Sequence, residues 1–226
     1  IHAHEDPVEN GHIQTDITLR ALKMGNYTGK LYIVIDNEDD TADRYRELYG
    51  DKVIQFDKLA ESKKFDTADI SEDRRAIVYA RNVCFDLAEK LGLEYFLELD
   101  DDYTDFEYRW PEGGKLMIKS IANLDALFSA MVEFLETSSA LSVALAQGGD
   151  LIGGANRFFH SGLSRKAMNT FFCKTSRRFK FVGRVNEDVN TYTSLGNKVG
   201  LFFTVTNVQI VQKQTQSQGG GMSGLY

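Results

Sequence analysis

Three consecutive aspartates, Asp100, Asp101 and Asp102, come directly after the apolar run Tyr95–Leu99. Adjacent carboxylates repel one another, so a fold that keeps them together needs a compensating cation. Mg²⁺ and Mn²⁺ bind carboxylate oxygens and leave coordination positions for phosphate groups. Because side chains alternate along an extended chain, Asp100 and Asp102 lie on the same side of it. The spacing therefore predicts a site for a divalent cation and a diphosphate, and the alternative is a solvated acidic loop.

The same run also fits a second chemistry. Asp100, Asp102 and Thr104 have the D-x-D-x-T spacing of haloacid-dehalogenase-like phosphatases, in which the first aspartate is the nucleophile. That chemistry requires a later lysine and an acidic pair at another strand end, and Asp150 is a poor candidate because no acid follows within reach. The motif of that family also belongs on the first strand, near the start of the domain. A phosphatase is therefore the second interpretation.

Glu187 and Asp188 are the only acidic residues between position 151 and the end of the sequence. Two adjacent carboxylates suit general-base catalysis, since one can hold an acceptor while the other takes its proton. We expect Asp188 to be the base and Glu187 to bind the acceptor, with the reverse order left open. The alternative is that both carboxylates form ion pairs with Arg184 and nearby lysines.

Other residues have the chemistry to bind a nucleotide. Asp36 ends the apolar run at 31–35, and we expect it to hydrogen-bond a base or a ribose. The alternative for Asp36 is a turn residue at the end of a strand. Arg81 is expected to reach a phosphate or to clamp the acidic cluster, and its alternative is a surface salt bridge. Asp100 and Asp101 complete the set predicted to bind the nucleotide.

Charge is divided unevenly along the 226 residues, although the net charge is only −7. Residues 1–150 carry a net charge of −15, and residues 151–226 carry +8. The acidic net charge argues against nucleic acid as a partner. The basic last part, however, suits a polyanionic partner, and the alternative interpretation of its basic residues is a solvated surface. We expect basic residues there to contact phosphates and an aromatic residue to stack on a displaced base. The predicted nucleic-acid contacts are Arg165, Lys166, Arg177, Arg178, Lys180 and Arg184.

Apolar periodicity places these residues on an α/β framework. The predicted elements are strands at 31–35, 53–56, 95–99, 141–145 and 200–211 and helices at 74–91 and 121–136. Gly92 suits the position just after the first of these helices. No strand is recognisable in residues 1–15. Trp110 is expected in an exposed loop at 108–114. Alternating strands and helices predict three α/β/α layers around a mixed, mostly parallel sheet, with ligands beyond the carboxyl ends of its strands.

Composition and length set further expectations. We expect a single domain in which residues 1–150 bind nucleotide and metal and residues 151–226 face the acceptor, with a flexible tail from about 212. No run of about 18 apolar residues and no secretory signal is visible, so no membrane partner is expected. Two isolated cysteines fit a reduced compartment, which makes the cytoplasm the expected location.

Taken in this order, the motifs resemble those of the GT-A class of nucleotide-sugar glycosyltransferases. The segments that carry the resemblance are 32–41, Ala80-Arg81-Asn82, 96–102 and 186–189. In that class the first strand-end aspartate binds the nucleoside, the D-x-D binds the metal, and the last element presents a carboxylate to the acceptor. The resemblance implies a UDP-sugar donor and Mn²⁺ or Mg²⁺, with Asp102 as a direct ligand and Asp100 acting through water or the ribose.

The later part of the chain is similar to a narrower group, the phage TET-associated glycosyltransferases, which modify DNA bases. The similar segments are 153–156, 162–169, 171–173, 183–192 and 219–222. This resemblance implies that the acceptor is 5-hydroxymethylcytosine or a similar base, in the cytoplasm of a bacterial host. The alternatives are a protein or glycan acceptor, and a silent module that only binds nucleic acid. The intact D-x-D and the Glu187–Asp188 pair argue against the silent module.

Overall fold

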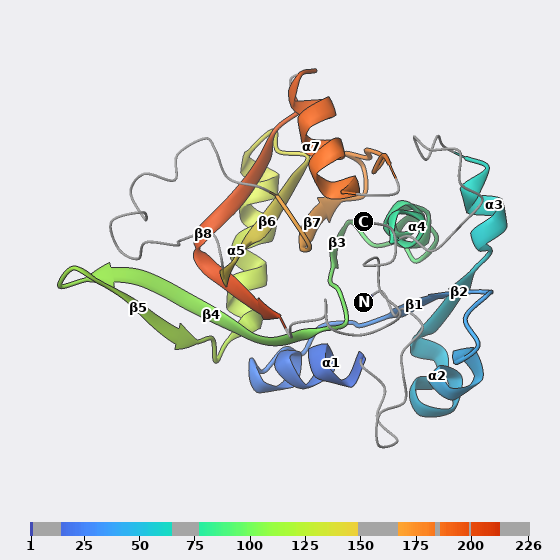
Figure 1. The fold of residues 1–226 in the computed structure, drawn as a ribbon, viewed down its shortest axis with the longest axis horizontal. Helices are drawn as coiled ribbons and strands as arrows, with labels where there is room; N and C mark the ends of the chain where they lie inside the picture. The colour runs from blue at the N-terminus through green and yellow to red at the C-terminus, as the bar shows by residue number, and fades with distance from the viewer. Residues whose placement is uncertain (2–14, 65–76, 149–166, 184–185, 199, 213–226) are drawn as a thin grey trace.

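The computed structural model describes residues 1, 15–64, 77–148, 167–183, 186–198 and 200–212. Helices and strands are interleaved along this part of the chain (Figure 1). The elements are α1 (Thr15–Met24), β1 (Ile33–Asp36), α2 (Ala42–Tyr49), the 3₁₀ turn η1 (Gly50–Lys52), β2 (Val53–Phe56), α3 (Lys58–Ser62), α4 (Val78–Lys90), β3 (Tyr95–Glu98), β4 (Tyr103–Glu112), β5 (Lys115–Ser120), α5 (Leu124–Thr137), β6 (Ser142–Gln147), β7 (Phe171–Lys174), α7 (Glu187–Gly196) and β8 (Phe202–Gln212).

A six-stranded sheet in the order β3-β7-β6-β8-β4-β5 forms the centre of the fold. Its β6–β8 pair is parallel, and the other pairs are antiparallel. A second sheet holds β1 and β2 as a parallel pair. The predicted mixed α/β sheet is confirmed, but the expected predominance of parallel pairing is wrong for the six-stranded sheet. Antiparallel pairing enters because β4 and β5 form a hairpin and because β7 inserts between β3 and β6.

Helices cover both faces of the six-stranded sheet, because successive side chains of a strand point to opposite faces. Val143 and Leu145 pack with apolar residues of α1 and α5 in one core cluster. Ala144, which lies between them on β6, packs with residues of α4 in another cluster, together with Phe171 of β7. These two clusters, one on each face, agree with the predicted three layers.

The strands and the long helices lie close to their predicted positions. β2 has its predicted bounds, and β3 is one residue shorter than its prediction. Helix α4 ends as Gly92 predicts: this residue has φ of +64°, its N–H donates to the Glu89 carbonyl, and the Leu93 N–H donates to the Ala88 carbonyl at 2.9 Å. This pair of bonds is a Schellman motif, in which glycine avoids the strain of a left-handed residue.

The hairpin β4–β5 lies partly where the sequence analysis expects a loop. Gly113 and Gly114 connect its strands with φ of +56° and +76°, as a two-residue turn of type I′ requires. Trp110 lies in β4 and pairs with Met117 of β5. The expected loop at 108–114 is therefore wrong. Two glycines between β-rich runs are the local signal that identifies the hairpin.

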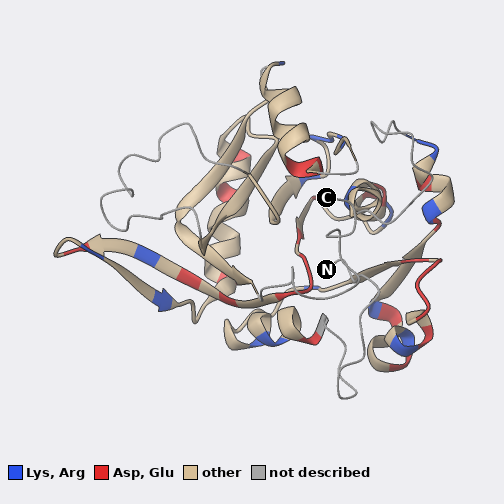
Figure 2. Ribbon diagram, viewed as in Figure 1, with Lys and Arg blue, Asp and Glu red and all other residues tan. Residues whose placement is uncertain are grey.

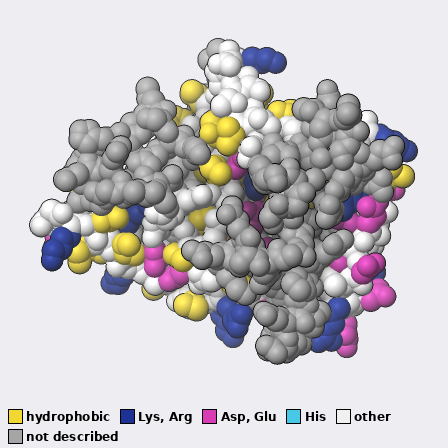
Figure 3. Space-filling model, in the orientation of Figure 1, with side chains coloured by type: hydrophobic (Ala, Val, Ile, Leu, Met, Phe, Trp, Pro, Cys, Tyr) yellow, Lys and Arg dark blue, Asp and Glu magenta, His cyan; other side chains and the backbone are white. Residues whose placement is uncertain are grey.

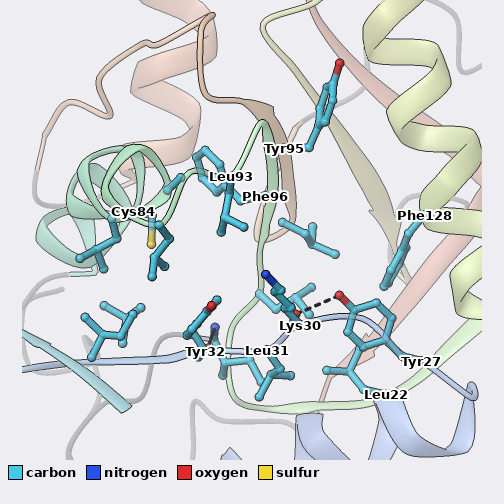
Figure 4. Close-up of a pocket in the computed structure, with 18 residues that line it drawn as sticks. Leu22, Tyr27, Lys30, Leu31, Tyr32, Cys84, Leu93, Tyr95, Phe96 and Phe128 are labelled. Carbon is cyan, nitrogen blue, oxygen red and sulfur yellow. Dashed lines mark hydrogen bonds between the residues drawn. The ribbon is translucent and has the colours of Figure 1, made fainter. Parts of the chain in front are cut away.

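An apolar cavity of about 290 Å³ lies between β1 and β3 (Figure 4). Its walls include Tyr32, which precedes β1, and Phe96 of β3. Ile1 also lines it: the Ile1 N–H donates to the Tyr32 carbonyl at 3.0 Å, and the Val34 N–H donates to the Ile1 carbonyl at 2.8 Å. These two hydrogen bonds, one on either side of Ile33, follow the pattern of a parallel strand pair. Ile1 therefore pairs with the edge of β1.

Candidate active site

The aspartate run forms the turn between β3 and β4, and helix α1 holds this turn. The Thr18 hydroxyl donates to the Asp100 carbonyl at 2.9 Å and accepts from the Tyr103 N–H at 3.0 Å, so one side chain ties both ends of the run. Asp101 and Asp102 are buried. Figure 2 shows acidic residues here and at the start of α7. The run is thus a tied turn with two buried carboxylates and a half-buried one, and not the solvated loop that was the alternative.

Arg81 joins this turn to the first turn of α7. Its Nη2 lies 3.4 Å from Asp100 Oδ1, and its Nε lies 3.3 Å from Glu187 Oε1. The guanidinium carbon lies 4.9 Å from the ring centre of Phe171 and 5.6 Å from that of Phe181. Only 2% of Arg81 is exposed, so a clamp on the acidic cluster fits this placement and a surface salt bridge does not.

The carboxylates around Arg81 act on one another electrostatically. Burial raises the pKa of Asp100 to about 7, and Asp102, Glu187 and Asp188 add to that rise while Arg81 opposes it. The Arg81 pKa is itself raised, because its acidic neighbours outweigh a burial that alone would lower it. Negative charge is therefore concentrated at this end of β3.

Glu98, on β3, belongs to the same group of charges and was not singled out from the sequence. It is buried, and burial raises its pKa to about 8, with Arg81 opposing the rise. A glutamate inside the apolar run Tyr95–Leu99 is the signal that identifies such a residue. A strand with one acidic side chain among apolar neighbours must bury that side chain or expose that face.

Glu187 and Asp188 occupy the first turn of α7, where the helix dipole favours negative charge. Asn186 precedes them in a left-handed conformation with φ of +52°. Both carboxylate residues are buried, and burial raises the pKa of Glu187 against the opposing effect of Arg81. Asp188 Oδ1 accepts from the Val189 N–H at 2.7 Å. The structure therefore places the two predicted catalytic residues beside the predicted metal turn.

Two amide side chains orient Asp102, and neither was found from the sequence. Gln212 Nε2 donates to Asp102 Oδ1 at 3.2 Å. Asn169 Nδ2 donates in turn to Gln212 Oε1 at 3.0 Å. Carboxylates that bind metals are commonly held by such hydrogen bonds from outside the ligand set. These hydrogen bonds link Asp102 to the last residue of β8 and to a residue just before β7, so no local sequence pattern reveals them.

Asp36 lies at the end of β1, as predicted, and contacts a lysine that the sequence analysis did not single out. Lys58 Nζ, on α3, lies 2.9 Å from Asp36 Oδ2 and 4.0 Å from Glu38 Oε2. Asp36 Oδ1 accepts from the Glu38 N–H at 2.8 Å. The Lys58 side chain is only 7% exposed. Asp36 is thus a paired strand-end carboxylate rather than a residue that only forms a turn.

Two of the predicted nucleic-acid contacts bind other parts of the protein. Arg177 Nη1 donates to the carbonyls of Leu135 and Ala140, at the carboxyl end of α5. Arg178 forms an ion pair with Asp86 of α4. Lys180 is exposed. The predicted contacts Arg165, Lys166 and Arg184 lie outside the described residues.

The aromatic residues of the basic part are mostly core residues. Four of the six phenylalanines that the structure describes in residues 151–226 are buried, namely Phe171, Phe172, Phe179 and Phe181, whereas Phe202 is half-buried and Phe203 is exposed. Trp110 is 37% exposed, and its indole N–H donates to Glu112 Oε2 at 3.0 Å. Trp110 therefore keeps the exposure expected of it, on a hairpin strand instead of a loop.

The donor set at the end of β3 fits a divalent cation. Asp100 and Asp102 supply hard carboxylate oxygens, and a bound cation would stabilise the charge of Asp100, whose pKa is raised first by burial and then by its acidic neighbours. In the part of the chain that the structure describes, no three histidine, cysteine, aspartate or glutamate side chains group as a metal site. A two-carboxylate site leaves the remaining positions to phosphate and water, as is usual for Mg²⁺. In the space-filling view, acidic and basic side chains show near the centre of one face (Figure 3).

A mixed α/β sheet between helical layers, with carboxylates at a strand end and on a nearby helix, defines a GT-A-like glycosyltransferase fold. The chain belongs to the TET-associated glycosyltransferase family, whose family model matches residues 8–221. No curated protein and no solved structure matches the chain. None of the helices in the described ranges has both the length and the apolar character needed to cross a membrane.

Proposed function

We propose that this protein transfers a sugar from a UDP-sugar to the hydroxyl of a modified DNA base, such as 5-hydroxymethylcytosine, with the help of Mn²⁺ or Mg²⁺. The observation that carries the proposal is the contact of Arg81 with both Asp100 and Glu187, which brings the strand-end carboxylates and the helix carboxylates into one site. Membership of the family supports the transfer of a sugar.

On the donor side, Asp102 would hold the cation directly, and Asp100 would hold it through water or contact the ribose. When bound, the cation neutralises charge on the departing diphosphate. Asp101 lies in the same turn and belongs to the donor-binding set. Asp36 binds the nucleoside, and Lys58 fixes the orientation of its carboxylate by their 2.9 Å contact.

On the acceptor side, Glu187 and Asp188 prepare the hydroxyl. Asp188 accepts the hydroxyl proton, while Glu187 holds the acceptor, or the two exchange roles. The hydroxyl oxygen forms a bond to the anomeric carbon of the sugar. The bond from that carbon to the diphosphate oxygen breaks, and its electron pair leaves with UDP. The raised pKa of Glu187 supports the exchanged roles, because a carboxylate with a raised pKa is a better proton acceptor near neutral pH than an ordinary one.

The basic last part of the chain supports DNA as the acceptor, since a neutral glycan has no need of such charge. Because Arg177 and Arg178 contact other parts of the protein, Lys180, Arg165, Lys166 and Arg184 carry more of the proposed phosphate contacts. The reaction takes place in the cytoplasm, where DNA and UDP-sugars are both present.

The test uses the protein, UDP-sugars, Mn²⁺ and a duplex that contains 5-hydroxymethylcytosine, followed by mass analysis of the digested nucleosides. We expect a hexose-sized gain in mass that Asp102→Asn abolishes. Asp43→Asn is the matched control, because Asp43 is a fully exposed aspartate of α2 and should leave the gain unchanged. No gain, together with no thermal shift on addition of UDP, would contradict the proposal.

Two further arms separate the acceptors and the chemistries. A duplex with unmodified cytosine should gain no mass, and transfer to a protein or glycan in place of DNA would exclude the DNA acceptor. Release of phosphate from simple esters would favour the phosphatase. Two contacts do not favour it: the Thr104 hydroxyl donates to the Val211 carbonyl, and Asp100 contacts Arg81.

A further inference from the structure

We infer that Arg81 is a positioning residue that holds the metal-side carboxylate Asp100 and the acceptor-side carboxylate Glu187 at a fixed separation. The inference rests on the proposed function and assigns Arg81 a role other than binding the diphosphate. Asp100 and Glu187 lie 87 positions apart in the sequence and on different elements, yet each has an oxygen within 3.4 Å of one guanidinium group.

The guanidinium group is fixed in place by its surroundings. Arg81 lies on α4, and its guanidinium group packs against the rings of Phe171 and Phe181, which contact each other with centroids 4.8 Å apart. The neighbouring Asn82 adds a second link, because its Nδ2 donates to the Phe181 carbonyl at 3.0 Å and its Oδ1 accepts from the Phe181 N–H at 2.9 Å. Arg81 and Asn82 therefore join α4 both to the chain before α7 and to α7 itself.

The burial of Arg81 argues against a contact with phosphate. Its Nε and Nη1 atoms are fully buried and make no hydrogen bond with the described residues, and its Nε faces Glu187. Arg81 is 2% exposed, and its Nη2 and Nε already face the carboxylates of Asp100 and Glu187, so a diphosphate would have to displace these contacts to reach it. The alternative from the sequence, a clamp on the acidic cluster, agrees with these contacts.

The charge of Arg81 keeps two repelling groups together. Two pairs of carboxylates face each other: Asp100 and Asp102 at the end of β3, and Glu187 and Asp188 in the first turn of α7. Asp102, Glu187 and Asp188 each add to the rise that burial causes in the pKa of Asp100, which shows that the two pairs repel. Without the guanidinium group, the start of α7 and the end of β3 repel each other and move apart. The sugar and the hydroxyl then lose their alignment, for which a displacement of about 1 Å can cost about 100-fold in rate.

The kinetic test compares Arg81→Met and Arg81→Lys with the wild type, with Arg44→Gln as the control for loss of an exposed, ion-paired arginine. We expect Arg81→Met to lower kcat about 100-fold. The KM for the UDP-sugar and the Kd for UDP with Mn²⁺ should change much less than kcat, since Asp102, the direct ligand of the proposed cation, keeps its own hydrogen bond from Gln212. Arg81→Lys should restore part of kcat. A Kd for UDP weakened more than about tenfold, with kcat unchanged at saturation, would show that Arg81 holds the diphosphate and would overturn the inference.

A stability test keeps this inference separate from the proposed function. If the wild type transfers no sugar to any acceptor, the proposed function fails, but Arg81 and Glu187 can still be tested by thermal unfolding. The Arg81→Met/Glu187→Gln double variant should have a higher Tm than Arg81→Met alone, because it no longer buries an unpaired carboxylate. If Arg81→Met does not fold, Arg81→Lys replaces it in the same comparison. A Tm lowered by the full sum of both single effects would overturn the inference.

Discussion

Two aspartates at strand ends, Asp36 after β1 and Asp100 after β3, each contact a buried cation from a nearby helix. Lys58 of α3 lies 2.9 Å from Asp36, and Arg81 of α4 lies 3.4 Å from Asp100. The lysine serves acids of one segment, since its second neighbour is Glu38. The arginine instead contacts a second carboxylate, Glu187, which belongs to a distant helix.

The two contacts differ in the geometry of the cationic group and in the number of separate chain segments that it joins. A lysine ammonium is a compact point charge, which is enough to fix one carboxylate beside a turn. An arginine guanidinium presents donors in several directions of one plane, so it can hold two carboxylates apart at a set distance. The Asp36 contact is therefore local, while the Asp100 contact couples two parts of the site.

The largest difference is expected in activity. Asp100→Asn should lower sugar transfer about 100- to 1000-fold, because it removes charge from the proposed metal turn and the partner of Arg81. Asp36→Asn should raise the KM for the UDP-sugar about tenfold, the effect of one lost hydrogen bond to a charged group, with little change in kcat. Steady-state kinetics on modified duplex DNA measure both. Equal losses in kcat would show that the two aspartates do not differ in role.

Loss of the lysine is expected to affect stability. Lys58→Met should lower the free energy of unfolding by about 1–3 kcal/mol, since it leaves the largely buried Asp36 carboxylate without its partner. Urea denaturation measures the change, and Lys52→Met, at an exposed lysine, is the control. If both variants lose the same amount, the Asp36–Lys58 contact contributes nothing of its own.

The acids around Arg81 should make stability depend on pH. Glu98, with a pKa of about 8, holds a proton in the folded protein at pH values where the unfolded chain has released it. Unfolding between about pH 5 and pH 8 therefore releases a proton, and the free energy of unfolding falls as pH rises, by up to about 1.4 kcal/mol per pH unit for each such group. Glu98→Gln should make this slope shallower in metal-free buffer. An unchanged slope in urea denaturation from pH 5 to pH 9 would contradict the assignment.

The smallest effect is expected at the second neighbour of Lys58. Glu38 lies 4.0 Å from the ammonium nitrogen and its side chain is 37% exposed, so solvent screens the pair. Glu38→Gln should change the free energy of unfolding by less than about 0.5 kcal/mol. A loss as large as that of Lys58→Met would show that Glu38, and not Asp36, is the main partner of the lysine.

The sequence predicts the positions of the strand-end aspartates well. Each follows a short apolar run, and neighbouring residues alone are enough to identify such a run as a strand. β1, β2 and β3 all lie within two residues of their predicted bounds, and Gly92 ends α4 as expected. The order of the strands in the sheet could not be predicted in the same way, because pairing joins segments that are far apart in the sequence. The insertion of β7 between β3 and β6, which makes the sheet largely antiparallel, leaves no trace in the periodicity of any one strand.

The partners of the site residues were the hardest to predict. Lys58, Gln212 and Asn169 are ordinary polar residues in the sequence, and only the fold brings them to Asp36 and Asp102. In the basic part, conversely, residues that the sequence marks as site residues have partners within the protein. A run of arginines suggests phosphate contacts, but composition alone cannot show that a guanidinium group binds the carbonyls at the end of α5 instead.

The Thr18 hydroxyl, which ties both ends of the aspartate turn, makes the opening of that turn cooperative with α1. The Tyr103 amide is protected by this hydroxyl, so its hydrogen can exchange with solvent only when the contact with α1 breaks. Local opening of the turn must therefore include at least a partial undocking of a helix whose Ala21 and Leu22 are buried in the main core cluster. The four residues between β3 and β4 are therefore held as rigidly as the docking of α1 on that core allows.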